Sequence, residues 1–164
     1  MPEVSDLIPL VIQAAREGDI ETLSRATAAG LDPDTTSPRG DSLLMLASYY
    51  GHAAAAQALI DAGADPDCRD MKGQTPLAGV AFKGLIDVAE VLLKGGASVD
   101  AASDDGRTPL MMAAAFNRTE MVSFLLGKGA SPGARDSSGM TAGDVARAMG
   151  AVDAAAILSP PPQA

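Results

Sequence analysis

The chain has 164 residues, with 21 acidic and 12 basic side chains and a formal net charge of −9. That negative charge opposes the counterion release that drives nucleic-acid binding, so DNA and RNA are not expected partners. Aromatic residues make up 3% of the chain and tryptophan is absent, which is thin for a conventional globular core. The composition instead suits a stack of small units built on alanine and leucine.

Cysteine content and the N-terminal sequence exclude further classes of protein. A single cysteine, Cys68, rules out an intramolecular disulfide and disfavours a cysteine-based metal site. The first 15 residues carry no lysine or arginine, and their longest apolar stretch runs from about Leu7 to Ile12. We therefore expect neither a signal peptide nor a membrane-spanning helix, and no membrane contact. A cytoplasmic location is expected, or a periplasmic one if a leader has been removed.

Glycine recurs at a fixed spacing along the chain. One unbroken series has members 33 residues apart, namely Gly40, Gly73, Gly106 and Gly139. Two further series keep the same spacing, one of them with Asn117 in place of a glycine. A period of this length predicts stacked copies of one small unit. We predict a single domain over residues 1–159, with units at about 4–36, 37–69, 70–102, 103–135 and 136–159, followed by a disordered proline-rich tail over 160–164.

The first unit differs from those that follow. It has no turn motif and begins with Ser5 and Asp6 ahead of Leu7. Pro9 is tolerable there only in the first turn of a helix. Units at the end of a stack are expected to be atypical in this way.

Each inner unit is expected to contain a turn and two short antiparallel helices. In the third unit, Gly73 permits the positive φ of a tight turn, and Thr75 supplies an N-cap hydroxyl. Proline at the first helical position starts a helix over about Pro76–Lys83, and a second helix is predicted over about Ile86–Lys94. Such a unit is too small to bury its own apolar face, so its stability must come from stacking on its neighbours. In the last unit, Gly143 stands where other units have leucine or valine, which predicts a weakened core at that end.

Two short motifs recur in step with the glycines. Thr-Pro-Leu occupies 75–77 and 108–110, and Gly-Ala-Asp or Gly-Ala-Ser occupies 63–65, 96–98 and 129–131. In these motifs the chain resembles an ankyrin-repeat protein over nearly its whole length. The resemblance implies an all-α repeat solenoid, an ankyrin-like stack of about five 33-residue helix-turn-helix units joined by hairpin-like turns.

The chain departs from the family pattern at one position in every unit that carries the motif. The histidine that the family has after Thr-Pro-Leu is replaced, and the resemblance implies that this histidine braces neighbouring loops. Its loss therefore predicts less rigid loops with an unchanged fold. The replacing residues are Met45, Ala78, Met111 and Asp144.

No pattern in the chain predicts catalysis. His52 is the only histidine and lies at the start of a second helix, where a structural or surface role is favoured over a general base. Cys68 has no histidine or basic cluster near it in sequence, so a packing role is favoured over a nucleophile. Asp104 and Asp105 are adjacent but occupy the tip of a turn, where a solvated loop is favoured over a metal site. We predict no enzyme activity, no catalytic residue, no cofactor and no metal.

The predicted recognition surface has two parts. In ankyrin-like stacks the two residues before the glycine that ends each first helix face a concave groove, and four of the five aromatic residues stand in this ladder. Aromatic anchors dominate the affinity of interfaces. The ladder positions predicted to bind protein are Arg16, Glu17, Tyr49, Tyr50, Phe82, Lys83 and Phe116. The turn tips contribute Arg39, Met71, Lys72, Asp104, Asp105 and Arg107.

Tyr50, Phe82 and Phe116 are expected to form one hydrophobic stripe. The family's stacking distance would set successive members about 10 Å apart. The competing interpretation is that some of these rings fold inward and cover the alanine-rich packing between units. Met45, Met111 and Met112 are expected to be packing residues.

The resulting prediction is a monomeric, non-catalytic module that binds another protein. An alternative is an acidic accessory or immunity-type protein that neutralises a basic toxin or accompanies an enzyme, because the net charge would steer a basic partner. The excess of arginine over lysine, with abundant alanine and glycine, favours a bacterial source. A small enzyme and a self-associating structural protein are the remaining alternatives.

Overall fold

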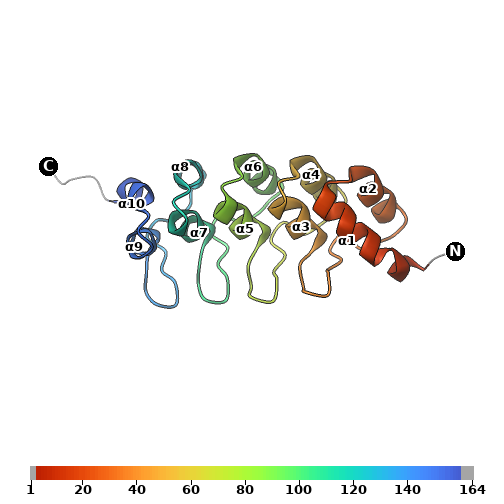
Figure 1. Cartoon of the computed structure of the whole chain (residues 1–164), viewed down its shortest axis with the longest axis horizontal. Coiled ribbons are helices and arrows are strands. Elements are labelled where there is room, and N and C mark those ends of the chain that lie inside the picture. Colours follow the sequence, from red (N-terminus) through yellow and green to blue (C-terminus); the bar gives the residue numbers. More distant parts are fainter. Residues whose placement is uncertain (1–2, 160–164) are drawn as a thin grey trace.

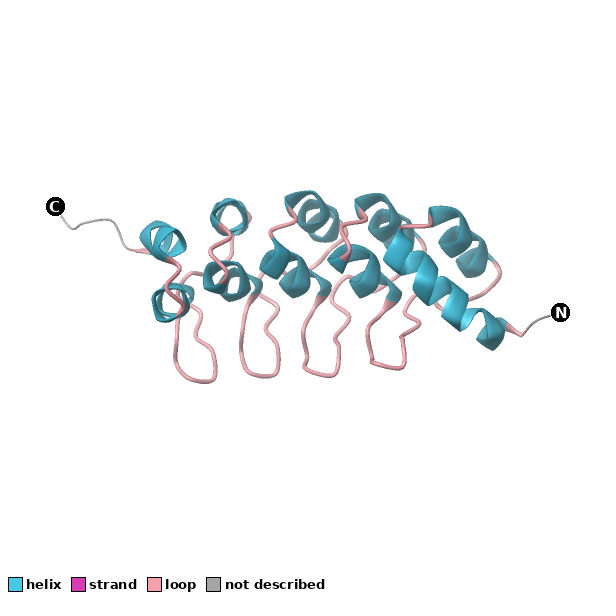
Figure 2. Cartoon of the chain, in the orientation of Figure 1, coloured by secondary structure: helices cyan, strands magenta, loops and turns pink. Residues whose placement is uncertain are grey.

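The computed structural model describes residues 3–159, so the tail predicted over 160–164 lies outside the described residues. Within that range the chain forms ten α-helices and no β-strand, arranged as an all-α repeat solenoid. The odd-numbered helices form one row and the even-numbered helices a second row, with the chain's two ends at opposite ends of the stack (Figure 1). Long loops project from the side of the odd-numbered row (Figure 2). This arrangement confirms the predicted fold class.

The helices are short and evenly distributed along the chain. A 3-10 turn, η1, precedes them over Val4–Leu7. The helices are α1 (Ile8–Glu17), α2 (Ile20–Ala28), α3 (Leu43–Tyr49), α4 (Ala53–Asp61), α5 (Pro76–Lys83), α6 (Ile86–Lys94), α7 (Pro109–Ala115), α8 (Thr119–Gly127), α9 (Ala142–Ala148) and α10 (Val152–Leu158).

The odd-numbered helices begin as their sequences predict. Thr75 is the N-cap of α5, and its hydroxyl accepts the Ala78 N–H over 3.4 Å. Proline follows at the first helical position, where its missing N–H costs nothing. Gly84 ends α5 in the left-handed conformation, with φ 75°. Asn117, which replaces a glycine in the periodic series, adopts the same region with φ 54°.

Two columns of apolar residues make one continuous core through the stack. In one column, a small side chain lets the odd-numbered helices approach closely, and Val80 and Ala113 are fully buried there. In the other column, leucines of the even-numbered helices pack between the two rows, and Leu92 and Leu125 are fully buried. The core therefore lies between the two rows, and each unit supplies part of its neighbour's burial.

The loops are held without the histidine that the family pattern places after Thr-Pro-Leu. Asp104 donates its backbone N–H to the Lys72 carbonyl over 3.1 Å, and Ser137 donates to the Asp105 carbonyl over 2.9 Å. Within one loop, the Asp70 carboxylate also accepts backbone N–H groups of residues 72 and 74. Backbone hydrogen bonds thus connect neighbouring loops near their tips, while the predicted lower rigidity of the loops stays a prediction.

Candidate functional site

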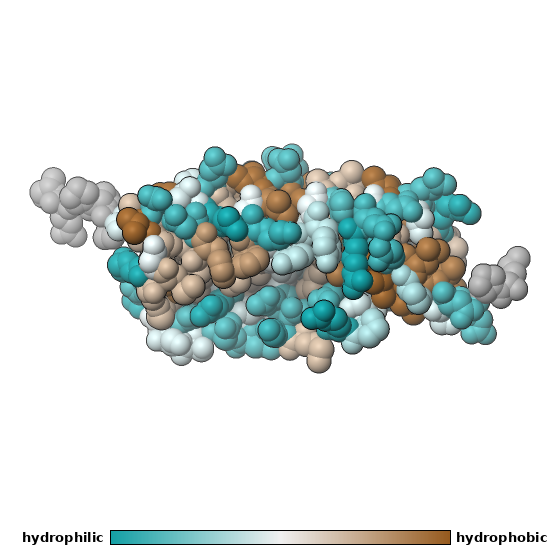
Figure 3. Space-filling view, in the orientation of Figure 1, coloured by the Kyte–Doolittle hydropathy of each residue, from teal (hydrophilic) through white to brown (hydrophobic). Residues whose placement is uncertain are grey.

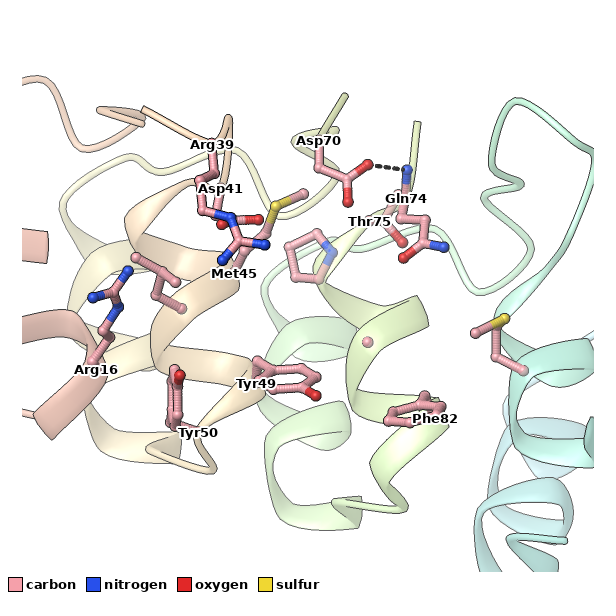
Figure 4. Close-up of a pocket in the computed structure, with 14 residues that line it drawn as sticks. Arg16, Arg39, Asp41, Met45, Tyr49, Tyr50, Asp70, Gln74, Thr75 and Phe82 are labelled. Carbon is pink, nitrogen blue, oxygen red and sulfur yellow. Dashed lines mark hydrogen bonds between the residues drawn. The ribbon is translucent and has the colours of Figure 1, made fainter. Parts of the chain in front are cut away.

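A groove of about 530 Å³ opens between the odd-numbered helices and the loops, centred on α3 and α5 (Figure 4). Helix residues supply one wall and loop residues the other. The lining residues are Arg16, Arg39, Asp41, Met45, Leu46, Tyr49, Tyr50, Asp70, Gln74, Thr75, Pro76, Gly79, Phe82 and Met112.

The groove gathers five of the residues predicted to bind protein. Arg16, Tyr49, Tyr50 and Phe82 come from the ends of three successive odd-numbered helices, and Arg39 comes from the loop before α3. Tyr49 and Tyr50 are 42% and 50% exposed, so two large rings face solvent in the groove wall. Exposed apolar side chains that lie together in this way often mark interaction surfaces.

The other predicted residues lie outside this lining. Glu17, Lys83 and Phe116 stand at the ends of odd-numbered helices, beside the groove. The remaining residues lie on the loops that project from the stack, and these are Met71, Lys72, Asp104, Asp105 and Arg107. Met71 is 81% exposed, whereas Asp105 forms an ion pair with Arg107, 3.5 Å between Oδ2 and Nε. Hydrogen bonds from the Ser103 hydroxyl and then from the Arg107 backbone lower the pKa of Asp105.

The expectation of an evenly spaced aromatic stripe is wrong. Phe82 and Phe116 meet edge to face, with ring centroids 4.4 Å apart, instead of standing a full repeat apart. Tyr49 and Tyr50 form a second edge-to-face pair at 5.7 Å. Such contacts stabilise paired rings beyond the burial of their area. The aromatic residues therefore form two clusters, of which only the tyrosine pair lies wholly within the groove lining.

Lys83 joins the tyrosine pair to the next unit. Its ammonium nitrogen lies 4.4 Å from the centroid of the Tyr49 ring and donates to the Tyr49 carbonyl over 2.9 Å. The side chain is thus attracted both to the ring face and to the end of α3. Lys83 therefore links α5 to the end of α3 and lies against the exposed tyrosine pair.

His52 and Arg118 hold other helix ends in the same manner. The His52 ring packs against Gly18, and its Nε2 donates to the Arg16 carbonyl over 2.8 Å, which places the proton on Nε2. Arg118 donates from Nε to the Phe82 carbonyl over 2.9 Å. Each of these carbonyls would otherwise be unpaired at a helix C-terminus. His52 has a structural partner in the preceding unit, in agreement with the structural role that its sequence position predicts.

Cys68 has the environment of a packing residue. Its sulfur lies 3.0 Å from the Ser42 hydroxyl oxygen. Burial raises the pKa of the thiol to about 11, so the thiolate that a nucleophile needs is scarce at neutral pH. In residues 3–159 we find no cluster of three or more histidine, cysteine or acidic side chains arranged to hold a metal ion. The same residues include no helix long and apolar enough to cross a membrane.

Sequence reasoning found Arg39 on the loop side of the groove but missed several other lining residues. These are Asp41, Asp70 and Gln74 on the loop side and Met45, Leu46, Thr75, Pro76, Gly79 and Met112 on the helix side. Leu46, Gly79 and Met112 recur at the repeat spacing, and the first two lie one helical turn before Tyr49 and Phe82. Residues three apart share a helix face, which is the signal that would have found them. Met112 was expected to pack, and it is half-buried while also lining the groove. Asp41 and Gln74 follow the loop glycines at the same spacing.

Comparison with known families agrees with this architecture. The family described as ankyrin repeats (3 copies) matches residues 11–103 and, in a second overlapping match, residues 80–163. The chain belongs to the ankyrin-repeat family. Ankyrin repeats generally mediate protein–protein interaction and are generally not enzymes.

A curated relative supports the assignment over part of the chain. An ankyrin repeat protein of Pseudomonas aeruginosa is 46% identical over 51 residues, which is 31% of this chain and 30% of the relative. The aligned part thus spans less than a third of the relative's own length.

The surface of this ankyrin-repeat protein is uneven in polarity. Apolar residues gather over α1 at one end and over α7 and α9 towards the other, with hydrophilic residues between them (Figure 3). Some of the acidic side chains serve the fold. The carboxylates of Asp34, Asp67 and Asp100 each accept a backbone N–H from the next linker, at 2.8–3.0 Å. A share of the net negative charge is therefore committed to holding neighbouring units together.

Proposed function

We propose that this ankyrin-repeat protein is a non-catalytic module that binds a partner protein in the groove between its odd-numbered helices and its loops. The observation that carries the proposal is the pair of exposed rings, Tyr49 and Tyr50, in the wall of the groove. Both rings are held by Lys83, so they contribute apolar area at a small cost in conformational entropy. The loop tips, with Met71 and Lys72, extend the surface beyond the groove.

The partner can be found by affinity capture on the full chain in an extract of the source cell, followed by mass spectrometry. The captured protein then serves to measure affinity. Tyr50→Ala should weaken binding about tenfold or more, because truncating a rigid aromatic anchor typically costs about 2 kcal/mol. Phe82→Ala should have a similar effect, whereas Phe116→Ala should act more weakly, through the loss of the ring that supports Phe82. Val152→Ala is the matched control, since Val152 is apolar and 74% exposed on α10, away from the groove.

Thermal unfolding of the same variants separates binding from packing. If the groove is the binding surface, the folding stability of Tyr50→Ala should change by less than about 1 kcal/mol, as is usual for exposed sites. Variants that lose several kcal/mol of stability but bind normally when folded would contradict the proposal. In that case the aromatic pairs are packing elements, and the loop tips would become the candidate surface.

An acidic accessory or immunity-type protein is the second candidate function. The net charge of −9 favours it, because that charge would accelerate encounter with a basic toxin or enzyme. This candidate predicts an association rate that falls steeply with rising salt, whereas the groove-centred candidate predicts a weaker dependence. We further propose that the protein is a monomer on its own, and light scattering at two concentrations would detect self-association.

A further inference from the structure

The arginine side chains divide by what they contact. Three are in ion pairs with carboxylates, and three donate to backbone carbonyls of loops or helix ends. The former are Arg25, Arg107 and Arg147, and the latter are Arg69, Arg118 and Arg135. The guanidinium groups of Arg16 and Arg39 have no such partner among the described residues, and both arginines line the groove.

The groove also contains two carboxylates, but these have internal partners. One oxygen of Asp70 accepts the backbone N–H groups of Lys72 and Gln74, at 2.8 and 2.9 Å. Asp41 accepts from the Ser37 hydroxyl over 3.5 Å, and its side chain is not within ion-pair distance of either arginine. The lining therefore has two positive and two negative side chains, and of these only the two guanidinium groups have no hydrogen-bond partner among the described residues.

The two arginines share one end of the groove. Figure 4 shows Arg16 and Arg39 on the side of α1 and α3, while Phe82 lies at the opposite end on α5. Tyr49 lies between these ends, and Pro76 at the start of α5 also lines the groove. The groove thus has two guanidinium groups at one end and apolar side chains of the helices along the rest of its length, while Asp41, Asp70 and Gln74 line its loop side.

We propose that the groove binds an extended segment of the partner protein that has acidic side chains at one end and apolar side chains after them. The carboxylates pair with Arg16 and Arg39, and the apolar side chains lie against Tyr49, Pro76 and Phe82. Guanidinium groups suit this role because they present a planar fork of donors that matches a carboxylate. The unpaired guanidinium groups select this occupant, because a carboxylate is the partner that they lack, whereas the carboxylates of the lining already accept hydrogen bonds. The inference rests on the proposed function and specifies the chemistry of the partner.

A library of random peptides displayed on phage is the test, with the purified full chain as target. We expect enrichment of sequences in which aspartate or glutamate precedes leucine, phenylalanine or another apolar residue. A synthetic peptide of the enriched sequence is then titrated against the wild type and variants by fluorescence anisotropy. Arg16→Gln and Arg39→Gln should each weaken it about fivefold or more, and replacing its acidic residues with their amides should have a matching effect.

Arg25→Gln is the control variant. Arg25 is highly exposed on α2, outside the groove, and its only charged contact is with Glu21. The affinity of the Arg25→Gln variant for the peptide should stay within about twofold of the wild-type affinity. Because Arg16 and Arg39 have no internal partner, their variants should also melt at the wild-type temperature.

The possible results distinguish a failure of this inference from a failure of the proposed function. Enrichment of basic peptides would overturn the acidic specificity, and so would apolar peptides that bind equally well to Arg16→Gln and Arg39→Gln. If Tyr50→Ala still weakens the binding of such peptides, the groove remains a binding site. Peptides that respond to neither the arginine nor the Tyr50 variant would contradict both, as would recovery of no peptide that depends on the groove.

Discussion

Ser42 and Ser48 are both buried on or beside α3, but only the Ser42 hydroxyl has hydrogen-bond partners. The Ser42 hydroxyl accepts the Met45 N–H over 3.1 Å as the N-cap of the helix. The Ser48 hydroxyl is fully buried and has no partner. At the repeat positions equivalent to Ser48, Ala81 and Ala114 are fully buried. Alanine is therefore known to fit this packing position.

We expect Ser48→Ala to raise the free energy of unfolding by about 1 kcal/mol, because it removes an unpaired polar group from the core. Ser42→Ala is the matched control and should lower it by about 1 kcal/mol through loss of the N-cap. Both values come from urea unfolding monitored by circular dichroism. A Ser48→Ala variant that is as destabilised as Ser42→Ala would show that the Ser48 hydroxyl has a partner after all.

At the scale of elements, the helices were predictable and the shape of the groove was not. α5 and α6 have the predicted bounds because their signals are local. α5 has an N-cap threonine, a proline at the first position and a glycine at the end, and α6 lies between Gly84 and Gly95. The contact between Phe82 and Phe116 depends on how two neighbouring units twist against each other, which no periodic pattern records. The same holds for Lys83, whose ammonium lies on a ring of the preceding unit. The directions of side chains that contact a neighbouring unit therefore could not be predicted from the sequence.

The α9 helix carries a glycine that a larger residue could replace. Gly143 is buried within the helix, and a Cβ atom there would lie 3.6 Å from Leu158 Cβ, an ordinary contact distance. Gly143→Ala should therefore stabilise the protein by about 0.5–1 kcal/mol, since alanine loses less backbone freedom in a helix. Gly95→Ala is the contrasting variant, because its Cβ would lie 2.8 Å from Ile60 Cδ1 and 3.3 Å from the Val91 carbonyl oxygen. It should give no gain, and equal stabilisation of the two variants by urea unfolding would refute the packing argument.

The whole molecule is a linear array in which each helix pair depends mainly on its neighbours, so its ends set where opening begins. The C-terminal pair is the weaker end. In α10 only Ala154 is fully buried, while Val152 and Ile157 are 74% and 40% exposed. At the other end, α1 buries Val11 completely and Ile12 almost completely. In each inner pair, both helices have buried leucine side chains.

Amide hydrogen exchange should therefore show residues 140–158 opening first, α1 and α2 later, and α5 to α8 last. The physical reason is that α9 and α10 share an interface with one neighbouring pair only, and that α10 contributes mostly alanine to it. Gly143→Ala provides an internal check, because it should increase protection in α9 and α10 and leave protection in α1 and α2 unchanged. Uniform protection from α1 to α10 would mean that the array unfolds as one cooperative unit. The same would follow if Gly143→Ala raised protection equally at both ends. In either case the C-terminal pair would have no separate stability.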